Sequence, residues 1–145
     1  MSELKWIHES AAQWDAGKEA LVGRAPEGIF ETSQFTPGEL VPGEWWRVED
    51  GGRVVGYGWM DCTWGDAEIL LVVDPGERGR GIGSFILDQL EREARDRGLN
   101  YLYNVVPASH PEPRRLATWL GRRRFSPFDG GRLMRRVLPP RSEGE

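Results

Sequence analysis

The sequence predicts a mixed α/β domain built around one central sheet, and three observations support this. The segment Glu68 to Val73 is a continuous apolar run, as expected for a strand covered on both faces in the middle of a sheet. Ile82 to Arg97 places its apolar residues along one helix face, and Gly98 ends that helix. Strand and helix patterns alternate through the rest of the 145 residues, a length that suits one packed core.

A strand and a helix are predicted at the amino terminus. Leu4 to Glu9 alternates apolar and polar residues, which is typical of a strand. Ser10 is expected to cap a helix that runs to about Val22. The expected buried stripe of this helix consists of Ala11, Trp14 and Leu21.

A hairpin is predicted before the central strand. The stretch from Gly23 to Gly43 contains three prolines and is predicted to be irregular, with one helical turn around Glu27 to Phe35. Trp45 to Glu49 and Arg53 to Asp61 are predicted as the two strands of the hairpin, joined by a tight turn at Asp50-Gly51-Gly52.

After the long helix, Tyr101 to Val106 is predicted as a strand, Arg114 to Arg123 as a helix and Arg132 to Leu138 as the last strand. No linker divides the chain, so residues 1 to 138 are predicted to form a single domain. The polar, proline-rich residues 139 to 145 are predicted to be a disordered tail.

Composition excludes several classes of protein. No run approaches the roughly 18 to 20 apolar residues that a membrane helix needs, and the amino terminus lacks the layout of a signal peptide. We therefore expect a cytoplasmic protein. The single cysteine, Cys62, cannot form an internal disulfide and lacks the neighbours of a zinc site, so no metal is expected. Cys62 is interpreted as a small apolar filler on a strand.

Charge is segregated along the chain. Met1 to Glu77 carries 15 acidic and 5 basic residues, whereas Arg78 to Glu145 carries 8 acidic and 14 basic residues. A basic half suits a polyanionic ligand such as a nucleotide phosphate, and an acidic half suits a cationic partner such as an amine. The alternative interpretation is that both sets are solvated surface charges.

A glycine-rich turn, Arg78-Gly79-Arg80-Gly81-Ile82-Gly83-Ser84, joins the central strand to the long helix. Glycines at alternate positions leave main-chain N–H groups unobstructed at a helix start, where the helix dipole also favours a phosphate or pyrophosphate. Arg78 and Arg80 add positive charge. The spacing matches neither the ATP-type loop nor the dinucleotide fingerprint. The alternative is a surface turn without a ligand.

This turn resembles the signature of the GCN5-related N-acetyltransferase (GNAT) family, which is Arg or Gln, two residues, Gly, one residue, and Gly or Ala. Arg78 to Gly83 matches that signature. Val73-Asp74-Pro75 is also similar to the family's strand end before the turn, and the hairpin segment Val54 to Gly58 is similar to the family's strand preceding this core. The resemblance covers Leu4 to Leu138, and its specific part lies between Arg53 and Arg124.

The resemblance implies a mostly antiparallel sheet that is splayed open at its middle and flanked by helices, with acetyl-CoA as co-substrate in the gap. Leu71, Val72 and Val73 would run beside the pantetheine arm, and a main-chain N–H near Val72 or Val73 would face the thioester oxygen. Main-chain N–H groups of the turn would bind the pyrophosphate. The turn residues implied are Gly79, Arg80, Gly81, Ile82, Gly83 and Ser84, with Arg78 beside them.

The same resemblance suggests catalytic residues. Glu68 lies where some family members place a glutamate that acts as general base, directly or through water. Asp61 and Asp66 are weaker substitutes, and a solvated carboxylate at a strand start is the alternative interpretation of Glu68. Many members carry a tyrosine acid where this chain has Ala117, so the general acid is left unassigned. His110 stands where the family often has asparagine and is a candidate proton carrier or cofactor contact.

Two further groups are expected near the substrates. Arginines between positions 114 and 124 would lie close to the nucleotide end of CoA, with Arg124-Phe125 in place of the family's Gly-Phe, and a solvated helix face is the alternative. Aromatic faces beside carboxylates in the acidic half could receive a cationic amine, although at least three of five tryptophans are expected in the core. These tryptophans are Trp14, Trp45, Trp46, Trp59 and Trp64.

The sequence thus predicts an N-acetyltransferase that moves an acetyl group from acetyl-CoA to a primary amine of a small molecule or peptide by direct attack. One alternative is a non-catalytic acyl-CoA-binding regulatory domain of the same fold, which the missing tyrosine favours. Another is a phosphate-binding or nucleic-acid-binding module, which the net charge of −4 disfavours. No nucleic-acid or membrane partner is expected, and a homodimer is a candidate assembly.

Overall fold

Seven strands form one sheet in the part of the chain that the computed structural model describes, which is residues 3–21, 36–41, 43–77, 79–105, 113–128 and 132–137. The strand order is β1-β2-β3-β4-β5-β7-β6, and every neighbouring pair is antiparallel except the parallel pair β4 and β5. This mixed, mostly antiparallel sheet confirms the predicted fold class. The strands are β1 (Leu4–Glu9), β2 (Glu44–Asp50), β3 (Arg53–Thr63), β4 (Asp66–Val73), β5 (Tyr101–Val105), β6 (Ser126–Phe128) and β7 (Arg132–Arg136).

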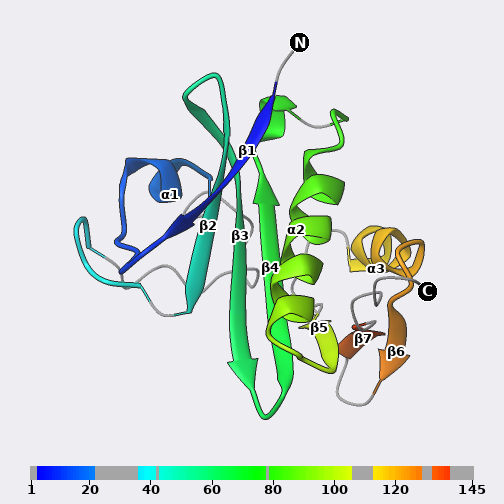
Figure 1. Cartoon of the computed structure of the whole chain (residues 1–145). Helices are drawn as coiled ribbons and strands as arrows, with labels where there is room; N and C mark the ends of the chain where they lie inside the picture. Colours follow the sequence, from blue (N-terminus) through cyan, green and yellow to red (C-terminus); the bar gives the residue numbers. More distant parts are fainter. Residues whose placement is uncertain are drawn as a thin grey trace, which may run out of the picture.

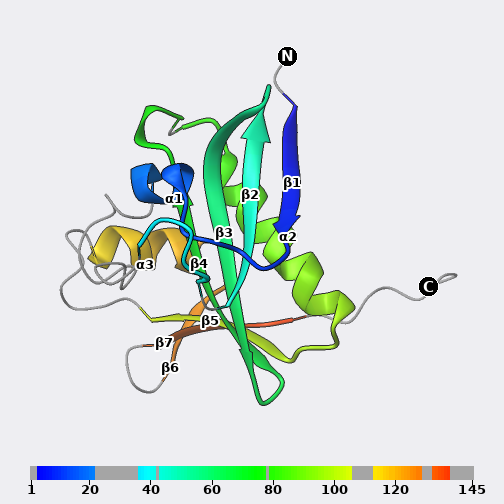
Figure 2. The same cartoon turned by 90° about the vertical axis from the view of Figure 1, so that its left-hand side faces the viewer.

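Helices cover both faces of the sheet. They are α1 (Ala16–Leu21), the short 3₁₀ turn η1 (Pro75–Glu77), α2 (Ile82–Asp96) and α3 (Pro113–Gly121). Figure 1 shows α2 running along β3 and β4, and Figure 2 shows α1 and α3 on the opposite side of the β2–β4 ribbons from α2. None of the described helices has both the length and the hydropathy needed to cross a bilayer.

Two apolar clusters pack on the two faces. The cluster under α2 buries Ile82, Ile86, Leu90 and Ala94 of the predicted helix face, with Phe85 partly buried against it, and it includes residues of β2 to β5, α3 and β7. Its closest approach is at Gly58 of β3, where a Cβ atom would lie 2.6 Å from the ring of Trp6. Trp6 in turn stacks on Trp46 with ring centroids 5.4 Å apart. The second cluster, under α1, consists of Ala12, Trp14, Val41, Trp45 and Tyr57.

The first helix differs from the prediction. It begins at Ala16 rather than after Ser10, and Asp15 caps it by accepting a hydrogen bond from the Lys18 N–H at 2.9 Å. The segment before it is extended because it pairs with the chain around Leu40: the Trp14 N–H donates to the Glu39 carbonyl at 2.7 Å. This long-range pairing outweighs the local helical pattern, and Ala11, expected in the buried stripe, is exposed at φ 51°.

Other predictions differ in smaller ways. The short edge strand β6 was not predicted, because three residues containing Pro127 carry too little alternation to show a strand. Cys62 is exposed, so its interpretation as an apolar filler is wrong; it lies near the turn of the β3–β4 hairpin. The turn predicted at 27–35, the end of the last strand at Leu138 and the tail 139–145 lie outside the described residues.

The two long helices end in the same hydrogen-bond pattern. After α2, Gly98 N–H donates to Arg95 and Leu99 N–H donates to Ala94, with Gly98 at φ 69°. This is the Schellman arrangement, which needs a left-handed residue after the helix. After α3, Phe125 N–H donates to Leu120 in the same way, but the left-handed position, at φ 70°, is Arg124. Arg124 therefore sits in a backbone conformation that costs a side-chain-bearing residue about 1 kcal/mol.

We predict that Arg124→Gly raises the melting temperature by about 2–4 °C, because glycine adopts the left-handed conformation without a Cβ clash. The matched control is Arg122→Gly, since Arg122 still donates its N–H to Thr118 within the last helical turn. That control should lower the melting temperature by a similar amount. Thermal unfolding followed by circular dichroism measures both, and a destabilised Arg124→Gly variant would contradict the expectation.

Candidate active site

The sheet divides after its central parallel pair. β4 and β5 pair only from Asp66 with Tyr101 to Glu68 with Tyr103. Beyond that point β4 continues to Val73 beside β3, whereas β5 stays paired with β7 along its whole length. The two halves of the sheet therefore separate from Ile69 onward, and we call this separation the fork. It is the splayed sheet that the sequence analysis expected.

Main-chain groups on one edge of β4 face the fork. The Asp74 N–H donates to the Val55 carbonyl of β3 at 2.9 Å, so Asp74 faces β3. The Ile69 carbonyl accepts a hydrogen bond from Asn104 of β5 at 2.9 Å, so Ile69 faces β5. Because successive residues of a strand face alternate neighbours, the main chains of Leu71 and Val73 face the fork and that of Val72 faces β3. Of the two amides considered from the sequence, the one at Val73 is thus directed into the fork.

The glycine-rich turn forms the start of α2. Gly79 and Gly81 have φ values of 84° and 78°, and a Cβ atom at either position would meet nothing within 4 Å. Gly81 is the N-cap of α2, and it provides no side-chain cap. The first hydrogen bond within the helix runs from the Phe85 N–H to the Gly81 carbonyl at 3.0 Å. The N–H groups of Ile82, Gly83 and Ser84 are therefore left without a helical acceptor, as the turn predicted.

The second arginine of the turn is already paired with carboxylates. Arg80 donates to Asp50 Oδ2 at 2.9 Å and also forms an ion pair with Glu77. The hydrogen bonds that Arg80 donates to Asp50 and Glu77 raise the pKa of its guanidinium above the usual value. Arg78 lies outside the described residues. Arg80 is thus held by two carboxylates at the rim of the turn.

A different arginine reaches the first turn of α2. Arg123, which follows α3, donates to Ser84 Oγ at 2.6 Å and to the Trp119 carbonyl at 3.2 Å. Its guanidinium also stacks on the Trp119 ring at 3.9 Å from the ring centroid. A Cβ atom at Gly83 would lie 3.4 Å from the same ring, so α3 packs directly against the turn. Among the described residues, no carboxylate forms an ion pair with Arg123.

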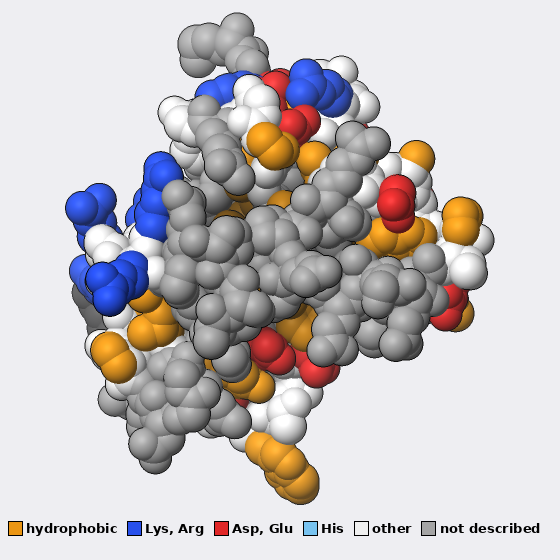
Figure 3. All heavy atoms as spheres, turned by 180° about the vertical axis from the view of Figure 1, so that it is seen from behind, with side chains coloured by type: hydrophobic (Ala, Val, Ile, Leu, Met, Phe, Trp, Pro, Cys, Tyr) orange, Lys and Arg blue, Asp and Glu red, His pale blue; other side chains and the backbone are white. Residues whose placement is uncertain are grey.

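Sequence reasoning placed Arg123 among five basic residues without singling it out. The other four do not share its contacts: Arg114, Arg115, Arg122 and Arg124 are exposed. Lys and Arg side chains gather along the left edge of Figure 3, which is the view from behind; this edge corresponds to the right-hand side of Figure 1, where α3 lies. Nothing in the local pattern distinguishes Arg123, because its contact with Ser84 joins residues 39 positions apart.

The carboxylates considered as bases lie together where the fork begins. Asp61 of β3 is opposite Glu68 of β4, and Tyr103 of β5 is beside Glu68, so all three side chains share the face that carries α1. Glu68 is half-buried and Asp61 is exposed. Asp66 lies two residues before Glu68, opposite Thr63. His110 lies outside the described residues, and Ala117 packs partly buried against the core.

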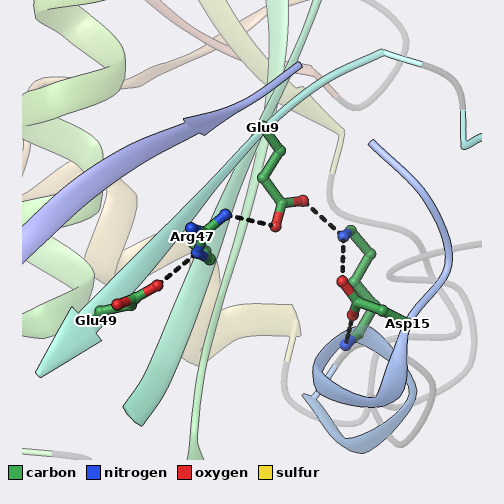
Figure 4. A network of polar contacts seen from close by, with 5 residues as sticks. Glu9, Asp15, Arg47 and Glu49 are labelled. Carbon is green, nitrogen blue, oxygen red and sulfur yellow. Dashed lines mark hydrogen bonds and ion pairs between the residues drawn. The ribbon is translucent and has the colours of Figure 1, made fainter. Parts of the chain in front are cut away.

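A charged network holds α1 against this face of the sheet, as Figure 4 shows. The Lys18 ammonium is fully buried, 2.6 Å from Glu9 Oε1 and 3.1 Å from Asp15 Oδ2. It also lies over the rings of Trp45 and Tyr57, at 5.4 and 5.3 Å. These two carboxylates and both rings are therefore occupied by a cation of the chain itself.

Arg47 extends the network along β2. It donates to Glu49 Oε2 at 2.5 Å and to Glu9 Oε2 at 3.3 Å. The Glu49 hydrogen bond, followed by that of Glu9, raises the pKa of the Arg47 guanidinium, and burial raises the pKa of the Tyr57 hydroxyl. Both groups stay protonated and cannot serve as bases.

The five tryptophans of the acidic half divide as the sequence analysis expected. Trp14, Trp45 and Trp46 are buried, and Trp59 packs partly buried against the α1 cluster. Trp64, at the tip of the β3–β4 hairpin, is 98% exposed. At least three of the five are therefore core residues, as predicted.

Comparisons with known proteins agree with this geometry. A model of the acetyltransferase (GNAT) family matches residues 8–121. The crystal structure of the Staphylococcus aureus Mu50 N-acetyltransferase is similar in fold, with a TM-score of 0.55 and 17% identity over 92% of this chain and 99% of that one. The Escherichia coli ribosomal-protein-S18-alanine N-acetyltransferase matches with a TM-score of 0.51 and 20% identity over 70% and 72% of the two chains. No curated protein sequence matches the chain.

Tetrahymena GCN5 is also similar in fold, with a TM-score of 0.52 and 15% identity over 67% of this chain and 69% of that one. At these identities the solved structures show the shared fold, and the family model, which covers most of the chain, shows the family. The protein belongs to the GNAT family and is an acetyl-CoA-dependent N-acetyltransferase.

Proposed function

We propose that the protein transfers an acetyl group from acetyl-CoA to a primary amine of a small molecule or peptide, by direct attack of the amine nitrogen on the thioester. The fork carries this proposal. Main-chain amides of Leu71 and Val73 are directed into the gap between β4 and β5. Glu68 lies where the fork begins, and the turn before α2 lies beyond the open end of the fork. An extended thioester arm fits such a gap, with its phosphates at the turn.

The phosphate end would be held by the first turn of α2. The N–H groups of Ile82, Gly83 and Ser84 are supported by the positive end of the helix dipole. Arg123 would supply the full positive charge, because its guanidinium contacts Ser84 and pairs with no carboxylate of the described chain. A second positive group beside a helix amino terminus is itself unfavourable, and a bound diphosphate relieves that repulsion.

The thioester end would lie against the fork-facing amides of β4. Attack of the amine turns the thioester carbonyl oxygen into an oxyanion, and an N–H at Val73 or Leu71 is preorganised to stabilise it. Collapse of this intermediate breaks the carbon–sulfur bond and releases the CoA thiolate. A thiol has an ordinary pKa of about 8.5, so its thiolate is a good leaving group and the proposal assigns no general acid.

Glu68 would take the proton from the incoming amine. A lysine-like amine has a pKa of about 10.4 and is almost wholly protonated at neutral pH, so attack requires a base. Glu68 is on the face that carries α1, at the point where β4 and β5 separate. Asp61, directly opposite on β3, is the exposed alternative.

Gly81→Glu is predicted to abolish the rise in melting temperature that acetyl-CoA produces, because a carboxylate there would face the diphosphate. Gly98→Glu is the matched control: Gly98 also has a positive φ and open space around its Cβ position, but it lies at the other end of α2. Equal backbone strain is thus introduced in both variants. Thermal shift assays with and without acetyl-CoA compare them, and a shift retained in Gly81→Glu refutes the turn as the phosphate site.

Arg123→Leu is predicted to weaken acetyl-CoA binding about 10- to 100-fold, the usual loss for a hydrogen bond to a charged group. Arg122→Leu, which changes an exposed neighbour, should bind normally. Calorimetry gives both dissociation constants. With S-acetylpantetheine, which lacks the diphosphate, Arg123→Leu and the wild type should react at the same rate; a difference there would mean that Arg123 acts on the fold and not on a phosphate.

Glu68→Gln is predicted to make turnover strongly dependent on pH. The variant can use only amine that is already neutral, a fraction that grows about tenfold per pH unit below a pKa of about 10.4, so its deficit should be largest at low pH. Asp61→Asn is the matched control and should follow the wild type. The acceptor comes from a screen of amines that detects released CoA. If Asp61→Asn shows the steep profile, the base is Asp61; if no amine releases CoA although CoA binds, the protein is an acyl-CoA-binding domain.

A further inference from the structure

The turn of the β3–β4 hairpin carries an apolar side chain that the fold does not use. The hairpin extends beyond the other strands at that end of the sheet, as Figures 1 and 2 both show. At its tip, Trp64 is 98% exposed and has a left-handed backbone, with φ 54°. Two-residue turns with positive φ at both positions favour Asn-Gly, and Gly65 already supplies the second residue, at φ 84°. Tryptophan therefore contributes neither burial nor a favourable turn conformation here.

One face of this hairpin end is packed and the other is open. On the side of α2, Arg97 contacts the hairpin, with Nη1 3.8 Å from Met60 Sδ and 3.9 Å from Cys62 Sγ. On the side of α1, which also carries Glu68, Tyr101 of β5 is 39% exposed beside the hairpin. The accessible path from the tip therefore leads along the α1 face toward the proposed base.

This path carries unpaired negative charge. The carboxylates of Asp61 and Asp66 form no hydrogen bond or ion pair in the described part of the chain. By contrast, Glu9 and Asp15, near α1, are both paired with Lys18. Unpaired carboxylates on an accessible face attract a positively charged ligand. A molecule that lies on this face is therefore expected to be cationic near the fork.

The distance between the two ends of the path limits the size of that molecule. Trp64 precedes Glu68 by four residues, so the two are about 13 Å apart along the hairpin. A small amine at Glu68 does not reach the tip. An extended peptide advances about 3.3 Å per residue, so four or five residues span the interval. Such a peptide presents a basic residue to the carboxylates and an apolar side chain to the indole ring, whereas a polyamine has no apolar side chain.

We propose that the acceptor is a peptide that lies along the α1 face of the hairpin. Its amine meets Glu68, a basic residue lies beside Asp61 and Asp66, and an apolar side chain four or five residues away packs on Trp64. This inference rests on the proposed acetyl transfer at Glu68, and it narrows the acceptor from amines in general to peptides. Trp64 is a docking residue that touches no reacting atom, and tryptophan is enriched among the residues that dominate binding energy at interfaces.

The test compares three probes: the hexapeptide Ala-Lys-Ala-Ala-Phe-Ala, the same peptide with alanine in place of phenylalanine, and the dipeptide Ala-Lys. Calorimetry on CoA-loaded protein measures the dissociation constants. The wild type should bind the hexapeptide about tenfold more tightly than either of the other probes. Trp64→Asn should bind both hexapeptides equally, and its fold is not weakened because it creates the favoured Asn-Gly turn.

Two further variants serve as controls. Trp64→Phe keeps an aromatic ring at the tip and should retain most of the preference for the phenylalanine peptide. Cys62→Ser changes an exposed residue on the opposite face of the same hairpin and should bind all three probes as the wild type does. A loss of preference in Cys62→Ser would contradict the assignment of the peptide to the α1 face.

The charge of the path is tested separately. Asp66→Asn should weaken binding of the hexapeptide about threefold, the usual value of an exposed ion pair, and this loss should shrink at high salt. A hexapeptide with alanine in place of lysine should bind Asp66→Asn and the wild type equally. Equal losses with both peptides would contradict the position assigned to the basic residue.

Three results overturn the proposal. The first is a hexapeptide that binds Trp64→Asn as tightly as the wild type. The second is spermine, a polyamine without side chains, losing as much affinity in that variant as the hexapeptide does, which would make the ligand a polyamine. The third is a dimer in sedimentation that dissociates in Trp64→Asn, which would make the partner a second copy. None of these needs turnover, so a failure of acetyl transfer is seen separately, as the absence of CoA release from acetyl-CoA with every peptide and small amine.

Discussion

The separation of β4 from β5 is the constraint on which the rest of this molecule depends. A sheet satisfies its main-chain groups by pairing every strand, and here one edge of a central strand gives up that pairing after three residues of β5. The lost hydrogen bonds are tolerated because both flanking ladders are complete: β4 stays paired with β3 along its length, and β5 stays paired with β7. The result is that the main-chain amides of Leu71 and Val73 face the gap between the strands, where a ligand could accept hydrogen bonds from them.

The electrostatics at the end of the fork follow from the same geometry. The turn before α2 must be open for a diphosphate to approach main-chain N–H groups, and glycine at two left-handed positions keeps it so. Arg80 lies at the rim of the turn, where it forms ion pairs with Asp50 and Glu77. Arg123 reaches the turn from the opposite half of the sheet and stacks on Trp119, which fixes its direction. In the proposed site the positive charge thus comes from Arg123, just after α3, so both halves of the divided sheet would contribute to it.

The face that carries α1 is organised by buried charge. Lys18 has no access to water and depends on Glu9 and Asp15 for its partners, so these groups hold α1 and β1 in one arrangement. The same network removes Glu9, Asp15, Trp45 and Tyr57 from the set of groups that could bind an acceptor amine. Glu68 and Asp61 lie farther along the same face, at the point where the fork begins.

The fold class, the central strand, both long helices and the glycine turn could be predicted from the sequence, because each is encoded by residues within a few positions of one another. Apolar spacing defines α2, a continuous apolar run defines β4, and left-handed glycines define the turn. The prediction started the first helix too early, because the residues expected to begin it pair instead with a segment about 25 residues away.

The charges and the fork itself were decided only by the tertiary structure. Whether Arg80 or Arg123 is the available cation depends on a carboxylate 30 residues distant in one case and on a contact 39 residues distant in the other. Asn104 is an ordinary strand residue in the sequence, and its position at the start of the fork appears only when β4 and β5 lie side by side. Local patterns specify which elements form, whereas electrostatic partners and unpaired amides depend on contacts between residues that the chain order does not bring together.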